Sequence, residues 1–223
     1  MRKFLYGKKV FLQEVVDGLV GPRFTDISHY SRMDNESMRD DEGSKFFSLS
    51  ECALEVFSGD CDFRLGGAGV GSMLSIPTEH CYCLCLSGRG NDPELFEKFK
   101  ADICIEIDVE VLLDIVGSVL SHRLKGAAVD AREITYYEPS LPPISVGSRD
   151  LVFFKPIQFS HEAEFRVVIF YPKDKRGFIC DGGVFVPFSI PGDSLHISFS
   201  SEDSSVFKRF VKGVFEFPGF CLG

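Results

Sequence analysis

The chain has 223 residues, a length that we expect to fold as a single domain covering residues 1–223. Hydrophobic residues make up 44% of it and 23 residues are Phe, so the sequence predicts a large core packed with Phe rings. The formal net charge of −9 argues against broad binding to the nucleic-acid backbone, which needs a surplus of Lys and Arg on one face. This net charge is still compatible with a local basic pocket that holds one small anionic ligand.

The first residues do not resemble a secretory signal, because Gly7-Lys8-Lys9 soon interrupts a short apolar patch. No apolar run approaches the length of a membrane span. Several cysteines lie within apolar stretches, where a reduced thiol behaves as a small hydrophobic group. These are Cys81, Cys83, Cys85 and Cys104. We therefore expect a cytoplasmic protein with free thiols and no contact with a membrane.

A metal site at the cysteine-rich segment is the alternative, since thiolates and His80 are ligands for soft metals. The cysteines stand two residues apart along a strand, and no second C-x-x-C pair is present to complete a tetrahedral site. The sequence therefore predicts no metal.

The first half of the chain alternates apolar and polar segments. Residues 9–20 are apolar and end at the turn Gly21-Pro22. The polar residues 34–44 are expected to form a solvated loop, and residues 45–50 a short strand. The glycine-rich residues 59–71 predict a flexible loop, because the Lys-Ser/Thr that completes a phosphate-binding loop is missing.

The middle of the chain has sharper patterns. Residues 80–87 are apolar on both faces, which predicts a central strand. Asp92-Pro93 begins a short helix that ends near Lys100. Residues 103–107 alternate as a strand, and Asp108 is expected to cap a helix over residues 109–124.

The remaining segments complete the fold class. Strands are expected at residues 133–137, 151–154, 164–170, 183–190 and 195–199, and a helix at residues 202–212. The pattern predicts an α+β fold with two packed, mainly antiparallel sheets and two or three flanking helices.

The segment Glu162-Ala163-Glu164-Phe165-Arg166 concentrates charge at the start of an apolar strand. Side chains two apart on a strand share a face, so Glu162, Glu164 and Arg166 meet if the strand begins early enough. Carboxylates that lie close together raise each other's pKa, and a guanidinium lowers both. Such a cluster stabilises charge in a cleft, or it is a structural Arg–Glu pair that ties strands together.

Three segments in chain order resemble the three-part signature of the ADP-ribosyltransferase fold: residues 25–32, residues 46–50 and Glu162-Ala163-Glu164. The resemblance implies an ADP-ribosyltransferase-like fold with NAD as cofactor. It implies Glu164 as the catalytic carboxylate with support from Glu162. The residues implied for NAD binding are His29, Tyr30, Arg32, Ser48 and Ser50.

The chain departs from this signature at several positions. The basic residue of the first strand could be Arg23, His29 or Arg32. Leu49 stands between Ser48 and Ser50 where one class of the family has Thr, and no Tyr occurs between Tyr30 and Tyr82.

The chain also resembles a family of uncharacterised bacterial and phage domains over about residues 20 to 175. The matching motifs are Tyr30 and Arg32, Arg39-Asp40-Asp41-Glu42-Gly43, Cys85-Leu86-Ser87, and the segment from Lys155 to Arg166.

The first resemblance implies an intracellular NAD-dependent mono-ADP-ribosyltransferase, such as a toxin, an effector or a phage–host conflict factor. A carboxylate near the ribose would stabilise the positive charge that develops when the bond to nicotinamide breaks. The macromolecular acceptor, protein or nucleic acid, stays open. The alternative is an acidic binding or inhibitor protein without catalysis. A hydrolase with paired carboxylates is disfavoured, because Glu162 and Glu164 are too close in sequence to flank a scissile bond.

Overall fold

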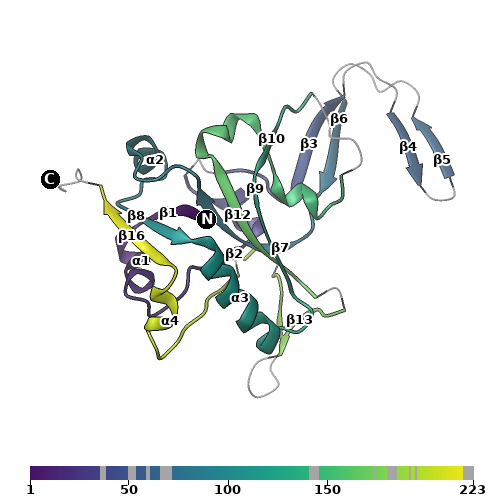
Figure 1. The fold of residues 1–223 in the computed structure, drawn as a ribbon. Coiled ribbons are helices and arrows are strands. Elements are labelled where there is room, and N and C mark those ends of the chain that lie inside the picture. Colours follow the sequence, from purple (N-terminus) through teal and green to yellow (C-terminus); the bar gives the residue numbers. More distant parts are fainter. Residues whose placement is uncertain are drawn as a thin grey trace.

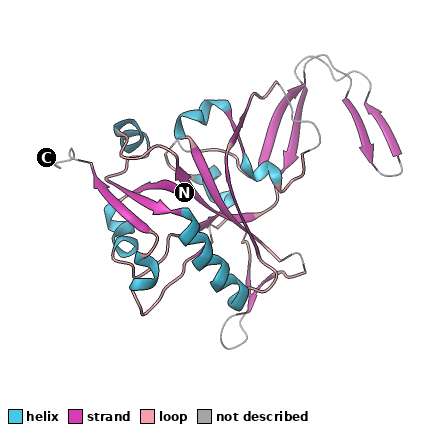
Figure 2. Cartoon of the chain, in the orientation of Figure 1, coloured by secondary structure: helices cyan, strands magenta, loops and turns pink. Residues whose placement is uncertain are grey.

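The computed structural model describes residues 1–35, 39–49, 54–58, 61–65, 72–140, 146–172, 174–179, 185–190, 192–193 and 195–217. They form an α+β fold in which helices pack against a large antiparallel sheet (Figure 1; Figure 2). The prediction of two packed sheets holds only in part. Within these ranges the strands make one eight-stranded sheet and four separate two-stranded sheets.

The eight strands of the large sheet come from the whole length of the chain. They are β1 (Arg2–Gly7), β2 (Phe24–Asp26), β7 (Cys81–Ser87), β8 (Ile103–Asp108), β9 (Ala128–Glu133), β12 (Glu164–Phe170), β15 (His196–Ile197) and β16 (Val211–Glu216). All of their pairings are antiparallel.

Strand β7 is the centre of the sheet, as its two apolar faces predict. It pairs with β12 along its whole length, from Cys81 opposite Phe170 to Ser87 opposite Glu164. Its other edge is shared by β2 and β1. Cys83 and Leu84 point to opposite faces and are only 1% and 3% exposed, which confirms that both faces are covered.

The first face of the sheet packs against helices. These are α1 (Lys9–Val16), α3 (Val109–Arg123) and α4 (Ser205–Lys208), whereas α2 (Pro93–Lys98) packs through Phe96 against Cys104 on the opposite face. Leu84 and Val167 belong to the same buried cluster as Leu112 and Val116 of α3, and Figure 1 shows α3 running beside the sheet. Helix α2 begins as expected, with the Asp92 side chain accepting a hydrogen bond from Glu94 N. Asp108 is the N-cap residue of α3 as expected, but its side chain accepts no capping hydrogen bond.

The second face of the sheet is covered by 3₁₀ segments instead of long helices. These are η1 (Ile27–Arg32), η2 (Asp150–Phe153) and η3 (Ile157–Glu162). At one end of this face, Cys83 and Val168 pack against Ile27 and Phe153. At the other end the same alternation places Cys85 and Ser87 of β7 opposite Arg166 and Glu164 of β12. The polar side chains of both central strands therefore gather at one end of one face.

The four small sheets lie outside this main sheet. Their strands are β3 (Ser44–Leu49) with β6 (Ser72–Pro77), β4 (Leu54–Ser58) with β5 (Cys61–Leu65), β10 (Thr135–Tyr137) with β11 (Phe154–Pro156), and β13 (Gly177–Ile179) with β14 (Phe185–Pro187). The β10–β11 pair is parallel. Phe47 of β3 packs against Tyr137 and Leu151, which anchors the β3–β6 pair near η2.

Three of the predicted elements were wrong. Residues 61–65, expected as part of a flexible loop, form β5 and pair with β4. Residues 150–153 form η2, and a strand begins only at Phe154. The helix expected over residues 202–212 is limited to α4, because the chain from Val211 onward becomes β16 and pairs with β8. The glycine run at residues 66–71 lies outside the described residues. No helix in the described part of the chain is long and apolar enough to cross a membrane.

Candidate functional site

Six buried charged side chains form one ion network at the polar end of the second face. In order of contact they are Lys45, Glu42, Arg166, Glu164, Lys155 and Glu162. Each is at most 6% exposed. Their charges alternate along the network, so each buried ion lies beside an opposite charge.

Arg166 is the centre of this network. Both of its terminal nitrogens donate to the carboxylate of Glu42, and Nε donates to Glu164 Oε1 over 2.5 Å. A further bond of 2.6 Å runs to the carbonyl oxygen of Val152. The guanidinium of Arg166 thus ties β12 to η2 and to the segment before β3. This agrees with the second interpretation of the motif, a structural Arg–Glu pair that holds segments together.

Lys155, from β11, joins the two glutamates of the Glu-x-Glu motif. Its Nζ donates to Glu162 Oε2 over 2.7 Å and to Glu164 Oε2 over 2.9 Å. Glu162 does not belong to strand β12, because it is the last residue of η3. Ala163 between the glutamates adopts a left-handed conformation with φ 43° and ψ 50°, which a residue with a Cβ rarely adopts. This turn brings Glu162 to the same lysine as Glu164.

A pocket opens beside Lys155 and both glutamates. It encloses about 490 Å³, counting the part that is open to solvent. Phe4, Tyr6, Tyr30 and Phe99 supply aromatic walls, and the remaining lining residues are Cys85, Leu86, Ser87, Lys155, Glu162 and Glu164. The Cys85 thiol donates to the hydroxyl oxygen of Tyr30 over 3.0 Å. Apolar walls with a few convergent polar groups are typical of a small-molecule site.

The two glutamates in this pocket differ in protonation. Burial opposes ionisation of Glu164, but the charges of Arg166 and Lys155 outweigh it and hold the pKa of Glu164 well below its ordinary value. Burial raises the pKa of Glu162 to about 7, although Lys155 opposes this rise. Glu162 Oε1 is buried and has no hydrogen-bond partner among the described residues. Glu162 is therefore the carboxyl group with a proton and a lone pair to exchange.

The structure brings together Tyr30, Glu162 and Glu164 from the predicted site. His29 and Arg32 lie on η1 and not on a strand, because β2 ends at Asp26, whose side chain accepts from Ser28 N and begins η1. Arg32 is exposed and donates to Ser28 Oγ and to the carbonyl oxygen of Asp193. In the described part of the chain, the lining of this pocket does not include His29 or Arg32.

Ser48 lies on β3, where its side chain is exposed while its neighbour Phe47 is buried. It is not among the described residues that line the pocket. Strand alternation instead turns Lys45 inward, where it pairs with Glu42. Ser50 lies outside the described residues.

The sequence analysis of the charged motif did not identify Glu42, Lys45 and Lys155 as partners of Arg166. Three of the motifs behind the resemblance to bacterial and phage domains do meet here, through Glu42, through Cys85 and Ser87, and through Lys155 to Arg166. Tyr30 from its first motif contacts Cys85. In the sequence, the order and residue types of these motifs were therefore the feature that indicated the cluster.

The cysteine-rich strand has the character of a packed core. The cysteines whose side chains are described, Cys81, Cys83, Cys85 and Cys104, are free thiols. His80 lies 2.8 Å from Asp26 Oδ2. Across the described ranges, no group of three or more His, Cys, Asp or Glu side chains is placed to hold a metal ion. That the protein needs no metal stays a prediction.

Comparison of the chain with models of protein families, with curated proteins and with solved structures found no match. The functional argument therefore depends on the geometry of the pocket.

The raised pKa of Glu162 predicts that stability falls as pH rises from about 4.5 to 7.5. Between these values the folded protein retains a proton that the unfolded chain releases, so the free energy of unfolding decreases through this window. Asp40, whose pKa is raised to about 6 by burial and by Glu42, acts in the same direction. Glu42 and Glu164 have lowered pKa values and lose their contribution below this window.

Urea unfolding of the wild type and of Glu162→Gln across this range checks the prediction. The variant cannot titrate at residue 162, so its stability should depend less on pH, by up to about 3 kcal/mol, since one pKa unit corresponds to about 1.4 kcal/mol. Parallel pH profiles for the two proteins would contradict a raised pKa of Glu162 in the folded state.

Proposed function

We propose that this chain is an NAD-dependent mono-ADP-ribosyltransferase-like enzyme with Glu162 as its acid–base group and Glu164 as a fixed negative charge. The observation that carries the proposal is the unpartnered oxygen of Glu162 in an aromatic-walled pocket. The order of the three sequence motifs supports the same chemistry. Glu164 keeps the charge-stabilising role expected from the sequence, and Glu162 gains the role of acid–base group.

The nicotinamide-ribose end of NAD fits the pocket. Aromatic side chains offer flat faces to a ring, and Glu162 Oε1 is placed to accept a hydrogen bond from an amide or a ribose hydroxyl. The diphosphate fits less well, because Lys155 is the basic residue in the described lining and it already pairs with Glu162 and Glu164. We therefore propose that the diphosphate lies toward the solvent-exposed side of the pocket.

NAD bound in this way would supply an ADP-ribosyl group, whose bond to nicotinamide breaks with the electron pair passing to the ring nitrogen. The carboxylate of Glu164 would stabilise the positive charge that develops on the ribose, because Arg166 and Lys155 hold it ionised and in place. Glu162 would take the proton from the acceptor hydroxyl, amine or amide as that group bonds to the ribose carbon. A carboxyl group with a pKa near 7 suits this proton transfer at neutral pH.

The proposed location is the cytoplasm, which holds NAD and keeps thiols reduced. Cys81 and Cys83 support it, since their sulfur atoms lie 3.6 Å apart as free thiols.

The test is incubation of the purified chain with NAD labelled separately on nicotinamide and on adenylate. We expect release of nicotinamide and transfer of the adenylate label to a cell extract, and digestion with protease or nuclease then identifies the acceptor class. If the chain neither binds nor consumes NAD at millimolar concentration, the proposal is wrong and the acidic binding or inhibitor protein replaces it.

A further inference from the structure

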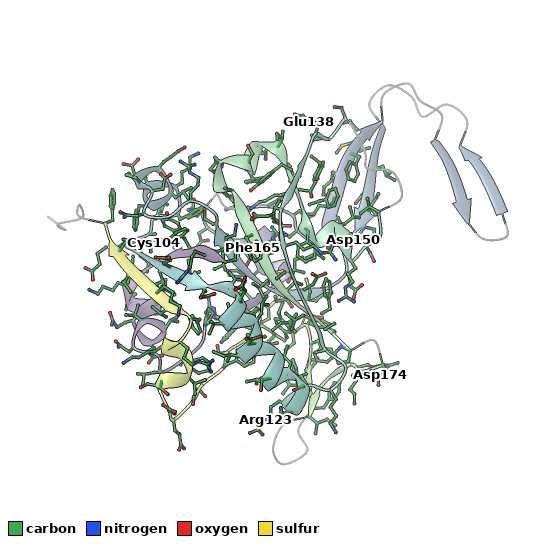
Figure 3. The ribbon with its side chains drawn as sticks, in the orientation of Figure 1. Cys104, Arg123, Glu138, Asp150, Phe165 and Asp174 are labelled. Atoms are coloured by element: carbon green, nitrogen blue, oxygen red, sulfur yellow. The ribbon has the colours of Figure 1, made fainter. Side chains whose placement is uncertain are left out.

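A second pocket lies where the C-terminal end of α3 meets the β13–β14 hairpin. It encloses about 660 Å³, counting the part that is open to solvent. Its basic lining residues are His122, Arg123 and Lys125 from the end of α3 and the turn after it, and Lys175 from the segment after β12. Figure 3 shows Arg123 at the end of α3 and Asp174 in the neighbouring loop. The fold thus gathers basic residues that are about 50 positions apart in the sequence.

The charge of this pocket differs from that of the chain as a whole. The chain has a net charge of −9, yet no acidic residue is among the described residues that line the pocket. Arg123, Lys125 and Lys175 take part in none of the ion pairs formed within the described ranges, whereas Arg89 and Arg132 are each paired with two carboxylates. The helix dipole favours basic residues such as Arg123 in the last turn of α3, but it does not account for Lys125 and Lys175, which lie beyond the helix.

The floor of the pocket is aromatic and held in place. Phe178 and Phe188 meet edge to face with their centroids 4.6 Å apart, and Phe188 stacks on Tyr171 at 4.5 Å. The hydroxyls of Tyr82 and Tyr171 both donate to the carbonyl oxygen of Phe188. Beside this floor, the side chain of Ile179 is 79% exposed. Phe188 is buried beneath this floor, so the apolar surface beside Arg123, Lys125 and Lys175 is formed by Phe178 and Ile179.

We propose that this pocket binds a phosphorylated nucleoside, with the phosphate against Arg123, Lys125 and Lys175 and the base over Phe178 and Ile179. Cations that bind phosphate and aromatic rings that stack on bases are the two components of nucleotide and single-strand binding sites. This ligand chemistry is shared by a free mononucleotide and by one nucleotide of a single strand. The inference does not depend on the proposed function, because the two pockets have no lining residue in common.

The experiment measures binding of AMP to the full chain by calorimetry at low salt, with adenosine, inorganic phosphate and poly-glutamate as separate probes. We expect AMP to bind at least about tenfold more tightly than adenosine or phosphate, because it engages both the cations and the floor. The double variant Arg123→Gln/Lys175→Gln should weaken AMP binding by about tenfold or more. Lys212→Gln, an exposed lysine on β16, should leave it unchanged, and so should Glu162→Gln in the first pocket.

A labelled eight-nucleotide single strand distinguishes the two sources of the ligand. Tighter binding than AMP with a steep salt dependence identifies a strand, and equal or weaker binding identifies the free nucleotide; either result supports the site. Equal affinity for phosphate or poly-glutamate would show a site for charge alone and overturn the proposal. Absence of AMP binding at about 10 mM, which is about ten times the dissociation constant of a weakly bound metabolite, would overturn the proposal as well. So would AMP binding that the double variant leaves intact.

Discussion

Replacing Arg166 by Met should lower the free energy of unfolding by about 3–5 kcal/mol, because the buried carboxylates of Glu42 and Glu164 lose their shared guanidinium and each keeps only a lysine as its charged partner. Arg166 donates to Glu42 through both terminal nitrogens and to Glu164 through Nε, and all three side chains are almost fully buried. Methionine fills much of the same volume, so loss of charge and not a cavity should dominate the effect. Urea unfolding at pH 7 measures the change.

Arg132 is the matched control for this substitution. It stands directly opposite Arg166 on β9, but it is exposed and pairs with Asp130 and Asp150 at the surface. Arg132→Met should therefore cost about 0–1 kcal/mol. Adding Glu42→Gln and Lys45→Met to Arg166→Met should restore part of the lost stability, since the carboxylate that lost the guanidinium and its remaining buried cation are then removed together. Equal effects at Arg166 and Arg132, or no recovery in the triple variant, would contradict a buried network held by Arg166.

The central part of the fold could be predicted from local sequence patterns. Residues 80–87 and 164–170 are apolar on both faces or nearly so, and such strands need cover on both sides, which places them at the centre of a sheet. The two-stranded sheets and the segment at Asp150–Phe153 could not be predicted in this way. Short apolar runs suit a strand or a 3₁₀ turn equally well, and distant partners such as Phe47 decide between them.

The candidate site could be predicted only for residues that are close in sequence. Glu162, Glu164 and Arg166 form one motif, and their proximity follows from it. Glu42 lies 124 positions before Arg166 in a polar stretch that is typical of a solvated loop, so nothing local indicates that it is buried. The different protonation of Glu162 and Glu164 depends on the left-handed turn at Ala163 and on Lys155, which no strand periodicity predicts.

The two glutamates of the motif should respond differently to the same substitution. Glu162→Gln should stay folded and lose about 10²–10³ in the rate of nicotinamide release, because Gln cannot exchange the proton at Oε1. Its stability above pH 7 should equal or exceed that of the wild type, since burial already disfavours the ionised form of Glu162.

Glu164→Gln should chiefly lower stability, by about 3–5 kcal/mol, because Arg166 and Lys155 then lose the carboxylate that both contact. Glu97→Gln, at an exposed position on α2, serves as the control that should change neither property. Initial rates with labelled NAD, measured beside melting temperature for all three variants, separate the two roles. A folded but inactive Glu164→Gln together with an active Glu162→Gln would exclude Glu162 from the reaction and leave Glu164 as the catalytic carboxylate. Full activity in both Glu162→Gln and Glu164→Gln would place any chemistry outside this pocket. An amide at either position carries no negative charge and transfers no proton, so a reaction in this pocket would be slowed by at least one of the two substitutions.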